Sequence, residues 1–424
     1  MPINTSKQAE SSYDVIIVGG GVQGAGVAQA VQAAGYNSLV LEKSHLAAGT
    51  SSKSSKLIHG GLRYIKSRDF SLVKESLRER RLLLKNAPDL IYSNQFYIPV
   101  YKHSCYRPWQ IRFALMAYWF LSGCCPDGRF KTIPKGRWPE LKGLKTDNLI
   151  KVFCYSDAQT DDVKLTEAVM QSAISLGAEI NCPAKLISAQ QTKGGYHVDY
   201  EENDTIKRTM CRFLVNAGGP WVNQIANCIS PTPKIIPISL VQGAHLELDT
   251  KISDECFYLE SPTDGRAVFV LPWKGGTLLG TTEKLHEGEP EDSAITAQER
   301  EYLLDVLNAH FPHYKGKVCG EMAGLRVLPQ NSEKQNYQNL SREVQLITDD
   351  NRPPHYLAIY GGKLTGYRAT ASKVVKIIES TLYKRTRRGS TKTLLLTENR
   401  LTAGARTEKV ITENTQPENT KASG

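Results

Sequence analysis

Three glycines near the start of the chain have the spacing of a backbone turn that binds phosphate. Gly19, Gly21 and Gly24 follow a short apolar strand and precede a run of small residues that favours a helix. Glycine at these positions permits a tight turn, lets backbone amides approach a pyrophosphate, and lets the helix pack closely against the strand. Glu42 follows the third glycine by 18 positions, where a carboxylate accepts hydrogen bonds from an adenosine ribose. The pattern therefore predicts a dinucleotide site, without choosing between NAD and FAD.

The segment that follows Glu42 is rich in hydroxyl groups and cations, which suit a loop running along a dinucleotide. From residue 50 to residue 64 it reads TSSKSSKLIHGGLRY. This run resembles the signature of FAD-dependent glycerol-3-phosphate dehydrogenases. The resemblance covers about residues 13 to 385, through motifs in the family's order: YSD at 155–157, NAGGPW at 216–221, GAH at 243–245, GTT at 280–282, GLR at 324–326 and GGKLTGYR at 361–368.

The resemblance implies that the chain binds FAD, and it assigns cofactor contacts along the chain. Leu186 is expected near the adenine, and the loop from Gly362 to Thr365 near the isoalloxazine. The longer members of the family continue into a helical C-terminal domain, so the sequence resembles a short form that lacks it. The implied cofactor residues are Gly19, Gly21, Gly24, Glu42, Thr50, Ser51, Ser55, Lys56, Leu57, Leu186, Gly218, Gly362, Leu364 and Thr365.

A small phosphate ester carries a dianion, so its site needs several converging cations. Arg63, Arg326 and Lys363 meet this need, and Tyr64 adds a neutral hydroxyl donor. The resemblance implies that Arg326 and Lys363 bind phosphate or a substrate oxygen, and that Arg63 and Tyr64 line the same cleft. Arg342 is a weaker candidate. We therefore expect one convergent pocket, although these residues lie far apart in the sequence.

The predicted reaction moves a hydride from a secondary alcohol to flavin N5 while a base removes the hydroxyl proton. His245 is the first candidate for the base. His59, inside the flavin loop, is the second, and its alternative role is to pack against or tune the flavin. We expect FAD-dependent oxidation of sn-glycerol 3-phosphate to dihydroxyacetone phosphate, with electrons passed to a quinone or another acceptor. Two alternatives stay open: a flavin-dependent amine or amino-acid oxidase of the same fold, and a non-catalytic flavin-binding scaffold.

The pattern of apolar residues supplies the elements that would position this chemistry. An apolar strand at 14–18, a helix at 22–34 and a strand at 38–41 form a βαβ unit. Helices are also expected at 163–176 and 369–383, and alternating strands at 241–280. This order predicts an α/β protein: a Rossmann-type FAD-binding fold with an interleaved, largely antiparallel β substrate lobe, as in flavoproteins like D-amino-acid oxidase.

The motifs divide the expected chain between two lobes and a tail. Residues 12–75, 150–235 and 345–385 would form a discontinuous FAD-binding lobe, and residues 76–149 and 236–344 the substrate lobe. The composition of residues 386–424 predicts a polar basic tail without fixed structure. The segment from Trp109 to Leu121 is strongly apolar but too short to span a bilayer. We expect it to form a buried core helix rather than an interfacial one.

Charge and cysteine content narrow the possible partners and location. The formal net charge is +10, and the nine cysteines include neither a CxxC pair nor a spacing shared with histidines. No metal site, disulfide framework or nucleic-acid partner is expected. The N-terminus lacks the pattern of a signal peptide, which favours a cytoplasmic location. If the acceptor is a quinone, the basic excess favours peripheral contact with the inner face of the cytoplasmic membrane.

Overall fold

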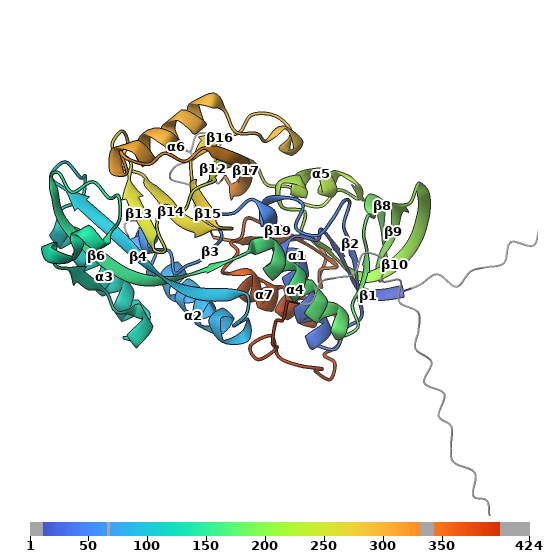
Figure 1. Ribbon diagram of the computed structural model, residues 1–424. Coiled ribbons are helices and arrows are strands. Elements are labelled where there is room, and N and C mark those ends of the chain that lie inside the picture. Colours follow the sequence, from blue (N-terminus) through green and yellow to red (C-terminus); the bar gives the residue numbers. More distant parts are fainter. Residues whose placement is uncertain (1–11, 66–67, 331–342, 399–424) are drawn as a thin grey trace, which may run out of the picture.

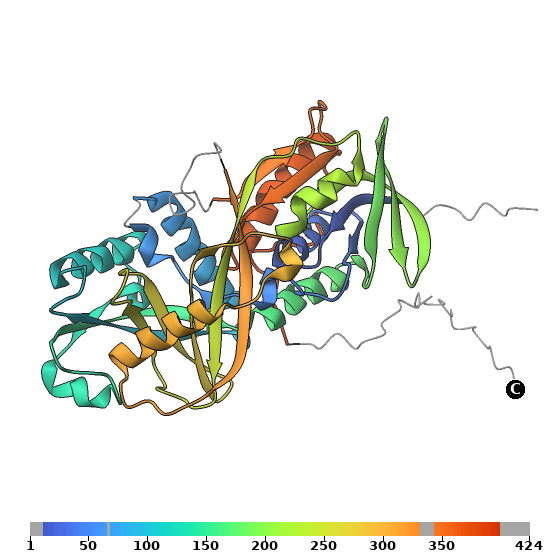
Figure 2. The same cartoon turned by 90° about the horizontal axis from the view of Figure 1, so that it is seen from above.

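Two mixed β-sheets form the framework of the molecule, and helices cover their faces (Figures 1 and 2). The computed structural model describes residues 12–65, 68–330 and 343–398. The first sheet has the order β11-β8-β9-β10-β1-β2-β7, with β19 beside β10 and β18 beside β19. Its strands are β1 (Ser12–Val18), β2 (Ser38–Leu41), β7 (Glu179–Asn181), β8 (Lys185–Thr192), β9 (Gly195–Glu202), β10 (Thr205–Asn216), β11 (Ile229–Ser230), β18 (Gln345–Thr348) and β19 (Tyr356–Tyr360).

The first sheet is built around the predicted βαβ unit. β1 runs parallel to β2 on one side and to β10 on the other. The connecting helix α1 (Val22–Ala33) is buried at every residue except Gln23. Its small side chains allow close packing against α4 (Asp162–Ser175) and α7 (Tyr367–Thr381), which lie beside it. The structure therefore confirms a Rossmann-type fold at the N-terminus, with β1 starting two residues before its predicted position.

The second sheet is largely antiparallel, as the sequence predicted. Its order is β16-β12-β15-β14-β13-β4-β6-β3, with β17 beside β12 and β5 beside β6. β13 and β4 form a parallel pair within it. Its strands are β3 (Leu57–Ile58), β4 (Ile91–Tyr101), β5 (Lys131–Ile133), β6 (Leu149–Thr160), β12 (Ile238–Leu248), β13 (Cys256–Glu260), β14 (Ala267–Trp273), β15 (Gly276–Gly280), β16 (Lys284–Leu285) and β17 (Val318–Pro329).

Helices lie on both faces of the second sheet (Figure 1). α6 (Ala297–His310) packs on one face, whereas α2 (Phe70–Asn86) and α3 (Pro108–Leu121) pack on the other. Phe96 and Tyr97 are neighbours on β4, and because side chains alternate along a strand they enter different cores. Phe96 joins the apolar cluster beneath α2 and α3, and Tyr97 joins the one beneath α6. The sheet is thus buried on both faces.

The chain passes between the two sheets within the segment expected to bind the flavin. β3 and all of β6 except Leu149 fall inside the ranges expected for the FAD-binding lobe, yet they pair with each other in the second sheet. β6 also pairs with β4 along its whole length. The loops on either side of β3 therefore lie at the junction of the two sheets, where residues from both can meet.

The apolar helix α3 differs from its prediction as a buried core helix. Only Leu115 and Tyr118 are buried. The side chains of Trp109, Phe113 and Phe120 are 70%, 68% and 73% exposed. α3 contacts α2, β6 and the turn at Leu62–Ile65, and these neighbours leave most of its aromatic side chains exposed. An apolar sequence shows that a helix could be buried, but it does not show how many faces of the helix are covered by other elements. The prediction of a core helix is therefore wrong.

The segment expected to begin an unstructured tail packs against the C-terminal ends of α1 and α2. The backbone amide of Arg388 donates to the carbonyl of Ala33, at 2.9 Å, and that of Leu396 donates to the carbonyl of Asn86, at 2.7 Å. The Leu396 side chain is buried in the core around α1. Residues 386–398 are thus part of the fold, because single apolar and backbone contacts anchor a segment that is polar on average. Residues 399–424 lie outside the described residues.

Within the described ranges, no helix combines the length and the apolar character needed to cross a membrane.

Candidate active site

A cavity of about 200 Å³ lies at the junction of the two sheets. Strands of the second sheet form one side, and loops that leave the first sheet form the other. The structure brings together in this cavity all six residues proposed for catalysis and substrate binding, although they are dispersed over some 300 positions of the sequence. These are His59, Arg63, Tyr64, His245, Arg326 and Lys363.

The glycine turn between β1 and α1 leaves no room for side chains. Gly19 has a φ of +115°, which L side chains rarely adopt, and a Cβ on it would lie 2.6 Å from the carbonyl oxygen of Ala217. A Cβ on Gly24 would lie 1.9 Å from the carbonyl oxygen of Gly19. The turn thus presses against itself and against the end of β10. This close backbone approach is what a pyrophosphate site requires.

Glu42 and Ser51 hold this turn in place. The amide of Gly20 donates to the Glu42 carboxylate at 2.6 Å, and the amide of Ser44 donates to its other oxygen at 2.9 Å. The amide of Val22, at the start of α1, donates to the Ser51 hydroxyl at 2.9 Å. Both residues were predicted as cofactor contacts, and the structure places each beside the glycine turn.

The loop after β19 meets the start of α1. Gly361 and Gly362 have φ values of +79° and +114°, and a Cβ on Gly362 would lie 2.6 Å from the side-chain nitrogen of Gln23. Within the described residues, the buried side-chain oxygen of Gln23 has no hydrogen-bond partner. The glycines at 361 and 362 leave space beside the Gln23 oxygen, which is a buried acceptor without a donor. Such a place fits part of a bound dinucleotide. FAD offers hydroxyl donors for such an acceptor, so the residues present are compatible with this cofactor.

The same loop also reaches the segment after β3. The Thr365 hydroxyl accepts a hydrogen bond from the amide of His59 at 3.2 Å, and Leu364 lines the cavity beside it. Thr50 donates to the carbonyl of Leu325 at 2.7 Å, which ties the predicted flavin loop to β17. Gly218 follows the same β10 end that contacts the glycine turn.

Two predicted cofactor residues have side chains that the structure directs elsewhere. The Lys56 ammonium forms a buried ion pair with Asp162 at 2.6 Å and lies 5.5 Å from the centre of the Trp273 ring. The Leu186 side chain is buried in the apolar cluster of the first sheet that includes Leu39. Neither side chain lines the cavity. Their cofactor roles stay predictions, which backbone atoms or surface shape would have to fulfil.

One end of the cavity is strongly cationic. The Lys363 ammonium lies 3.9 Å from the centre of the Tyr64 ring, and the Arg63 guanidinium lies 5.0 Å from the same ring. Arg63 also donates to the Tyr64 hydroxyl at 3.1 Å. The buried tyrosine therefore spaces two cations that come from segments 300 positions apart. A cation close to an aromatic ring is stabilised by the negative charge of the ring face.

Arg326 approaches the cavity from β17. Its guanidinium donates to the Thr281 hydroxyl at 3.3 Å, and a Cβ on Gly243 would lie 2.7 Å from one of its nitrogens. A side chain at position 243 would therefore displace the guanidinium of Arg326 from this place beside β12. Arg342, the weaker candidate, lies outside the described residues.

His245 points into the cavity from β12 and is almost fully buried. Its Nε2 lies 2.8 Å from the Ser55 hydroxyl, and its Nδ1 has no hydrogen-bond partner within the described residues. Gly280, on the adjacent strand β15, is the strand partner of His245, and a Cβ on it would lie 2.2 Å from the imidazole ring. Burial lowers the pKa of His245 to about 3, and the charges of Arg326 and Lys56 add to this effect. The imidazole is therefore neutral at pH 7 and able to accept a proton.

Two further groups around the cavity were not singled out from the sequence. Tyr258 and Phe269 line it and contact each other edge to face, with ring centres 5.2 Å apart. Burial raises the pKa of Tyr258 to about 12, so this hydroxyl stays protonated. Strand alternation alone marked these positions as core, and no motif distinguished them. Thr281, by contrast, belongs to the GTT motif and could have been chosen from it.

A buried network supports the loop that carries Arg63 and Tyr64. The amide of Gly60 donates to the Tyr118 hydroxyl at 2.9 Å, and that hydroxyl donates to Asp157 at 2.9 Å. Arg80 completes the network with a 2.8 Å ion pair to the same carboxylate. α2 and α3 thus fix the start of the loop, which keeps its cations directed at the cavity.

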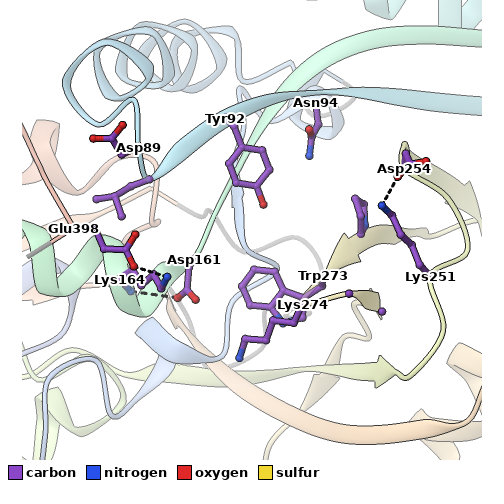
Figure 3. A pocket seen from close by; sticks show the side chains of 14 residues that line it. Asp89, Tyr92, Asn94, Asp161, Lys164, Lys251, Asp254, Trp273, Lys274 and Glu398 are labelled. Carbon is purple, nitrogen blue, oxygen red and sulfur yellow. Dashed lines mark hydrogen bonds and ion pairs between the residues drawn. The ribbon is translucent and has the colours of Figure 1, made fainter. Parts of the chain in front are cut away.

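A larger cavity of about 520 Å³ lies elsewhere, between the start of β4, the β14–β15 turn and the start of α4 (Figure 3). Its charged side chains are largely paired with one another: Lys164 with Glu398 at 2.5 Å, and Lys251 with Asp254. No residue proposed for catalysis or binding lines it. Size alone therefore does not identify the site, and the smaller cavity carries the convergent chemistry.

Comparison with known proteins gives consistent results. Residues 14–368 match the family model described as FAD dependent oxidoreductase. The chain is 35% identical over 372 residues to a glycerol-3-phosphate dehydrogenase of Pseudomonas aeruginosa, which covers 86% of this chain and 71% of that protein. It is 34% identical over 367 residues to a D-erythritol 1-phosphate dehydrogenase of Brucella abortus, which covers 85% of this chain and 72% of that protein.

Solved structures show the same architecture. The structure of the glycerol-3-phosphate dehydrogenase from Bacillus halodurans complexed with FAD superposes with a TM-score of 0.72 at 25% identity. The match covers 92% of this chain and 68% of that chain. The similarity therefore extends through both sheets and the cavity between them.

Proposed function

The chain belongs to the FAD-dependent oxidoreductase family and FAD is its cofactor; from this premise we propose that it oxidises sn-glycerol 3-phosphate to dihydroxyacetone phosphate. The observation that carries the substrate is the convergence of Arg63, Arg326 and Lys363 on one small cavity. A phosphate monoester bears two negative charges, and three cations beside a neutral base suit a small phosphorylated alcohol.

Several of the residues expected to hold FAD lie close together, at the glycine turn and in the loop after β19 that meets the start of α1. The glycine turn and the start of α1 suit the pyrophosphate, and Glu42 suits the adenosine ribose next to it. The loop from Gly362 to Thr365 suits the isoalloxazine, since it borders the cavity beside His59. When bound, FAD supplies the acceptor for the hydride that leaves the alcohol carbon.

His245 is proposed as the base that takes the hydroxyl proton. Its imidazole is neutral at pH 7, because burial and the charges of Arg326 and Lys56 lower its pKa. A bound phosphate dianion would offset the charge of Arg326, which would raise the pKa of His245 and make it a better proton acceptor. Ser55, 2.8 Å away, orients the ring. His59 is the second candidate, because its backbone is fixed against Thr365 at the flavin end of the cavity.

The three cations suit an amino-acid substrate less well than glycerol 3-phosphate, and they suit D-erythritol 1-phosphate equally well. An amino-acid oxidase needs one arginine for a carboxylate, and the two further cations favour phosphate over that alternative. D-Erythritol 1-phosphate shares the phosphate and the secondary alcohol, and the relative that acts on it is as similar as those named for glycerol 3-phosphate. It is therefore the second candidate substrate.

Peripheral contact with an anionic bilayer is proposed for α3, with a quinone as the electron acceptor. Trp109, Phe113, Met116 and Phe120 form an exposed apolar stripe at helical spacing, which we call the α3 stripe. Exposed arginines stand just before the helix at position 107, within it at 112 and after it at 129. An apolar face with a cationic rim is typical of helices that lie in a bilayer interface. A quinone acceptor dissolved in the membrane would explain why such a face is exposed.

The first experiment is anaerobic mixing of the purified FAD-bound protein with one candidate substrate at a time. Glycerol 3-phosphate, D-erythritol 1-phosphate, glycerol and glycine are compared by the loss of oxidised-flavin absorbance. Rapid loss with glycerol 3-phosphate and not with glycerol is expected, because only the phosphate engages the three cations. A faster loss of absorbance with D-erythritol 1-phosphate would make that compound the preferred substrate. A loss of absorbance only with glycine would reject phosphate recognition.

The membrane proposal has a separate test in sedimentation with phosphatidylglycerol-containing vesicles at low salt. The native protein is expected to sediment with the vesicles, and Phe113→Ser/Phe120→Ser to stay in the supernatant. Ile206→Ser is a matched control, because Ile206 is 67% exposed on β10, away from α3. Equal sedimentation of all three proteins would exclude the α3 stripe as the contact.

A further inference from the structure

Behind the cavity, one carboxylate lies between two arginines. Oε1 of Glu283 lies 3.8 Å from a guanidinium nitrogen of Arg326, and Oε2 lies 3.8 Å from a guanidinium nitrogen of Arg266. The three side chains are 17%, 24% and 28% exposed, so solvent screens them only in part. Neither Glu283 nor Arg266 lines the cavity. The carboxylate is therefore shared between a residue of the candidate site and one outside it.

The ion pair of Arg326 with Glu283 is looser than the buried ion pair of Arg368 with Glu79. Arg368 and Glu79 form two hydrogen bonds of 2.6 Å in a buried fork, which uses the arginine fully. The 3.8 Å contact of Arg326 exceeds the length of a charge-assisted hydrogen bond, about 2.7–2.9 Å. Arg326 is held by Thr281 at 3.3 Å and attracted by Glu283, but its planar fork is not consumed by the carboxylate.

Arg266 anchors Glu283 from the other side. Its guanidinium donates to the backbone carbonyl of Glu283 at 3.0 Å, and it also pairs with Asp264 at 3.4 Å. Asp264 in turn accepts a hydrogen bond from Tyr302 of α6 at 2.9 Å. The position of Glu283 is thus fixed by a chain of contacts that ends on a helix of the second sheet.

We propose that Glu283 is a positioning residue for phosphate recognition: it aims Arg326 at the cavity, and Arg266 limits how strongly it competes for that arginine. A bound dianion withdraws Arg326 from the shared carboxylate, while Glu283 keeps Arg266 as its partner and is not left as an unpaired charge. The inference rests on the proposed function, because it assumes that the cavity binds a phosphate group.

The test is the dissociation constant of inorganic phosphate, measured on the FAD-bound protein by flavin difference absorbance, with KM and kcat for glycerol 3-phosphate. Glu283→Gln removes the competitor, so phosphate should bind about fivefold more tightly while kcat falls, because Arg326 is no longer aimed. Arg266→Met removes one cation from Glu283, whose charge then acts more strongly on the cavity arginines Arg326 and Arg63, so phosphate should bind about fivefold more weakly. Shifts in the same direction, or no shifts, would overturn the proposal.

Matched controls separate this role from net charge and from folding. Arg300 and Glu321 form an exposed 2.6 Å pair, with Glu321 also on β17, so Glu321→Gln and Arg300→Met make the same charge changes away from the cavity. Control shifts as large as those at positions 283 and 266 would reject a specific role. Arg266→Lys keeps the charge and should restore most of the phosphate affinity, and FAD content reports folding. If the native protein binds phosphate but does not oxidise glycerol 3-phosphate, the proposed function fails while the opposite shifts still decide this inference.

Discussion

The two ends of the candidate active site are built in different ways. At the nucleotide end, the glycine turn presents backbone, and a Cβ on Gly24 would lie 1.9 Å from a carbonyl oxygen. At the substrate end, side chains of Arg63, Arg326 and Lys363 arrive from three separate segments. The nucleotide end depends on positions that have no side chain, and the substrate end depends on particular charged side chains. The nucleotide end should therefore fail with any added side chain, and the substrate end only when one particular group is removed.

Gly24→Val should have the largest effect, because it tests the end that has no space. The added side chain collides with the backbone of Gly19, and overpacking against rigid backbone costs about 1–3 kcal/mol or more. Loss of the turn should abolish FAD binding, measured as the ratio of flavin to protein after purification. Gly194→Ala is the control, since a Cβ there meets no atom within 4 Å. A yellow, fully loaded Gly24→Val protein would break the comparison at its first end.

Arg326→Met should have the next largest effect and should leave FAD content unchanged. Removal of a charge-assisted contact to phosphate is expected to lower kcat/KM for glycerol 3-phosphate about 10³-fold. Oxidation of the neutral substrate glycerol should change little, since it makes no phosphate contact. Arg300→Met, on the exposed surface, serves as the control for a lost arginine. If FAD is lost together with activity, the two ends are not independent, and the comparison would need revision.

His245→Asn should reduce kcat by at least about 10²-fold, the usual contribution of a general base. Asparagine keeps a polar group of similar size but cannot accept the proton. The pre-steady-state rate of flavin reduction is the appropriate measurement, because it isolates the chemical step. His313→Asn is the control, since His313 is exposed and remote from the cavity. A normal reduction rate in His245→Asn would transfer the role of base to His59, which can be tested by the same substitution.

The smallest expected effect is on the stability of the protein in acid, and it tests whether His245 at the substrate end is buried in its neutral form. His245 has a folded-state pKa of about 3 and an ordinary value of 6.5, so the unfolded chain binds more protons between these values. Stability should therefore fall as the pH drops from about 6.5 toward 3. Between pH 7 and pH 5 the native protein should lose about 2 kcal/mol more than His245→Gln in urea unfolding. Parallel losses in the two proteins would show that the imidazole is not buried in a neutral form.

The elements that the sequence predicted best are those with local causes. A strand, a glycine turn and a helix of small residues occupy adjacent positions, so the βαβ unit followed from spacing alone. The motifs also predicted the residues that meet in the cavity, because each carries a distinctive residue type. What they could not predict was the partner of each group: Ser55 was assigned to the cofactor, yet its hydroxyl lies 2.8 Å from His245.

Glycine spacing and apolar periodicity in the sequence were enough to predict the fold and a dinucleotide site, and residue type was enough to predict a cationic substrate site. The choice of FAD came from the family resemblance. Only the tertiary structure decided that α3 exposes its aromatic side chains, that Lys56 pairs with Asp162, and that residues 386–398 fold onto α1. Each of these depends on which elements lie next to one another. Burial and ion pairing arise from neighbours distant in the chain, and a single sequence does not state which neighbours those are.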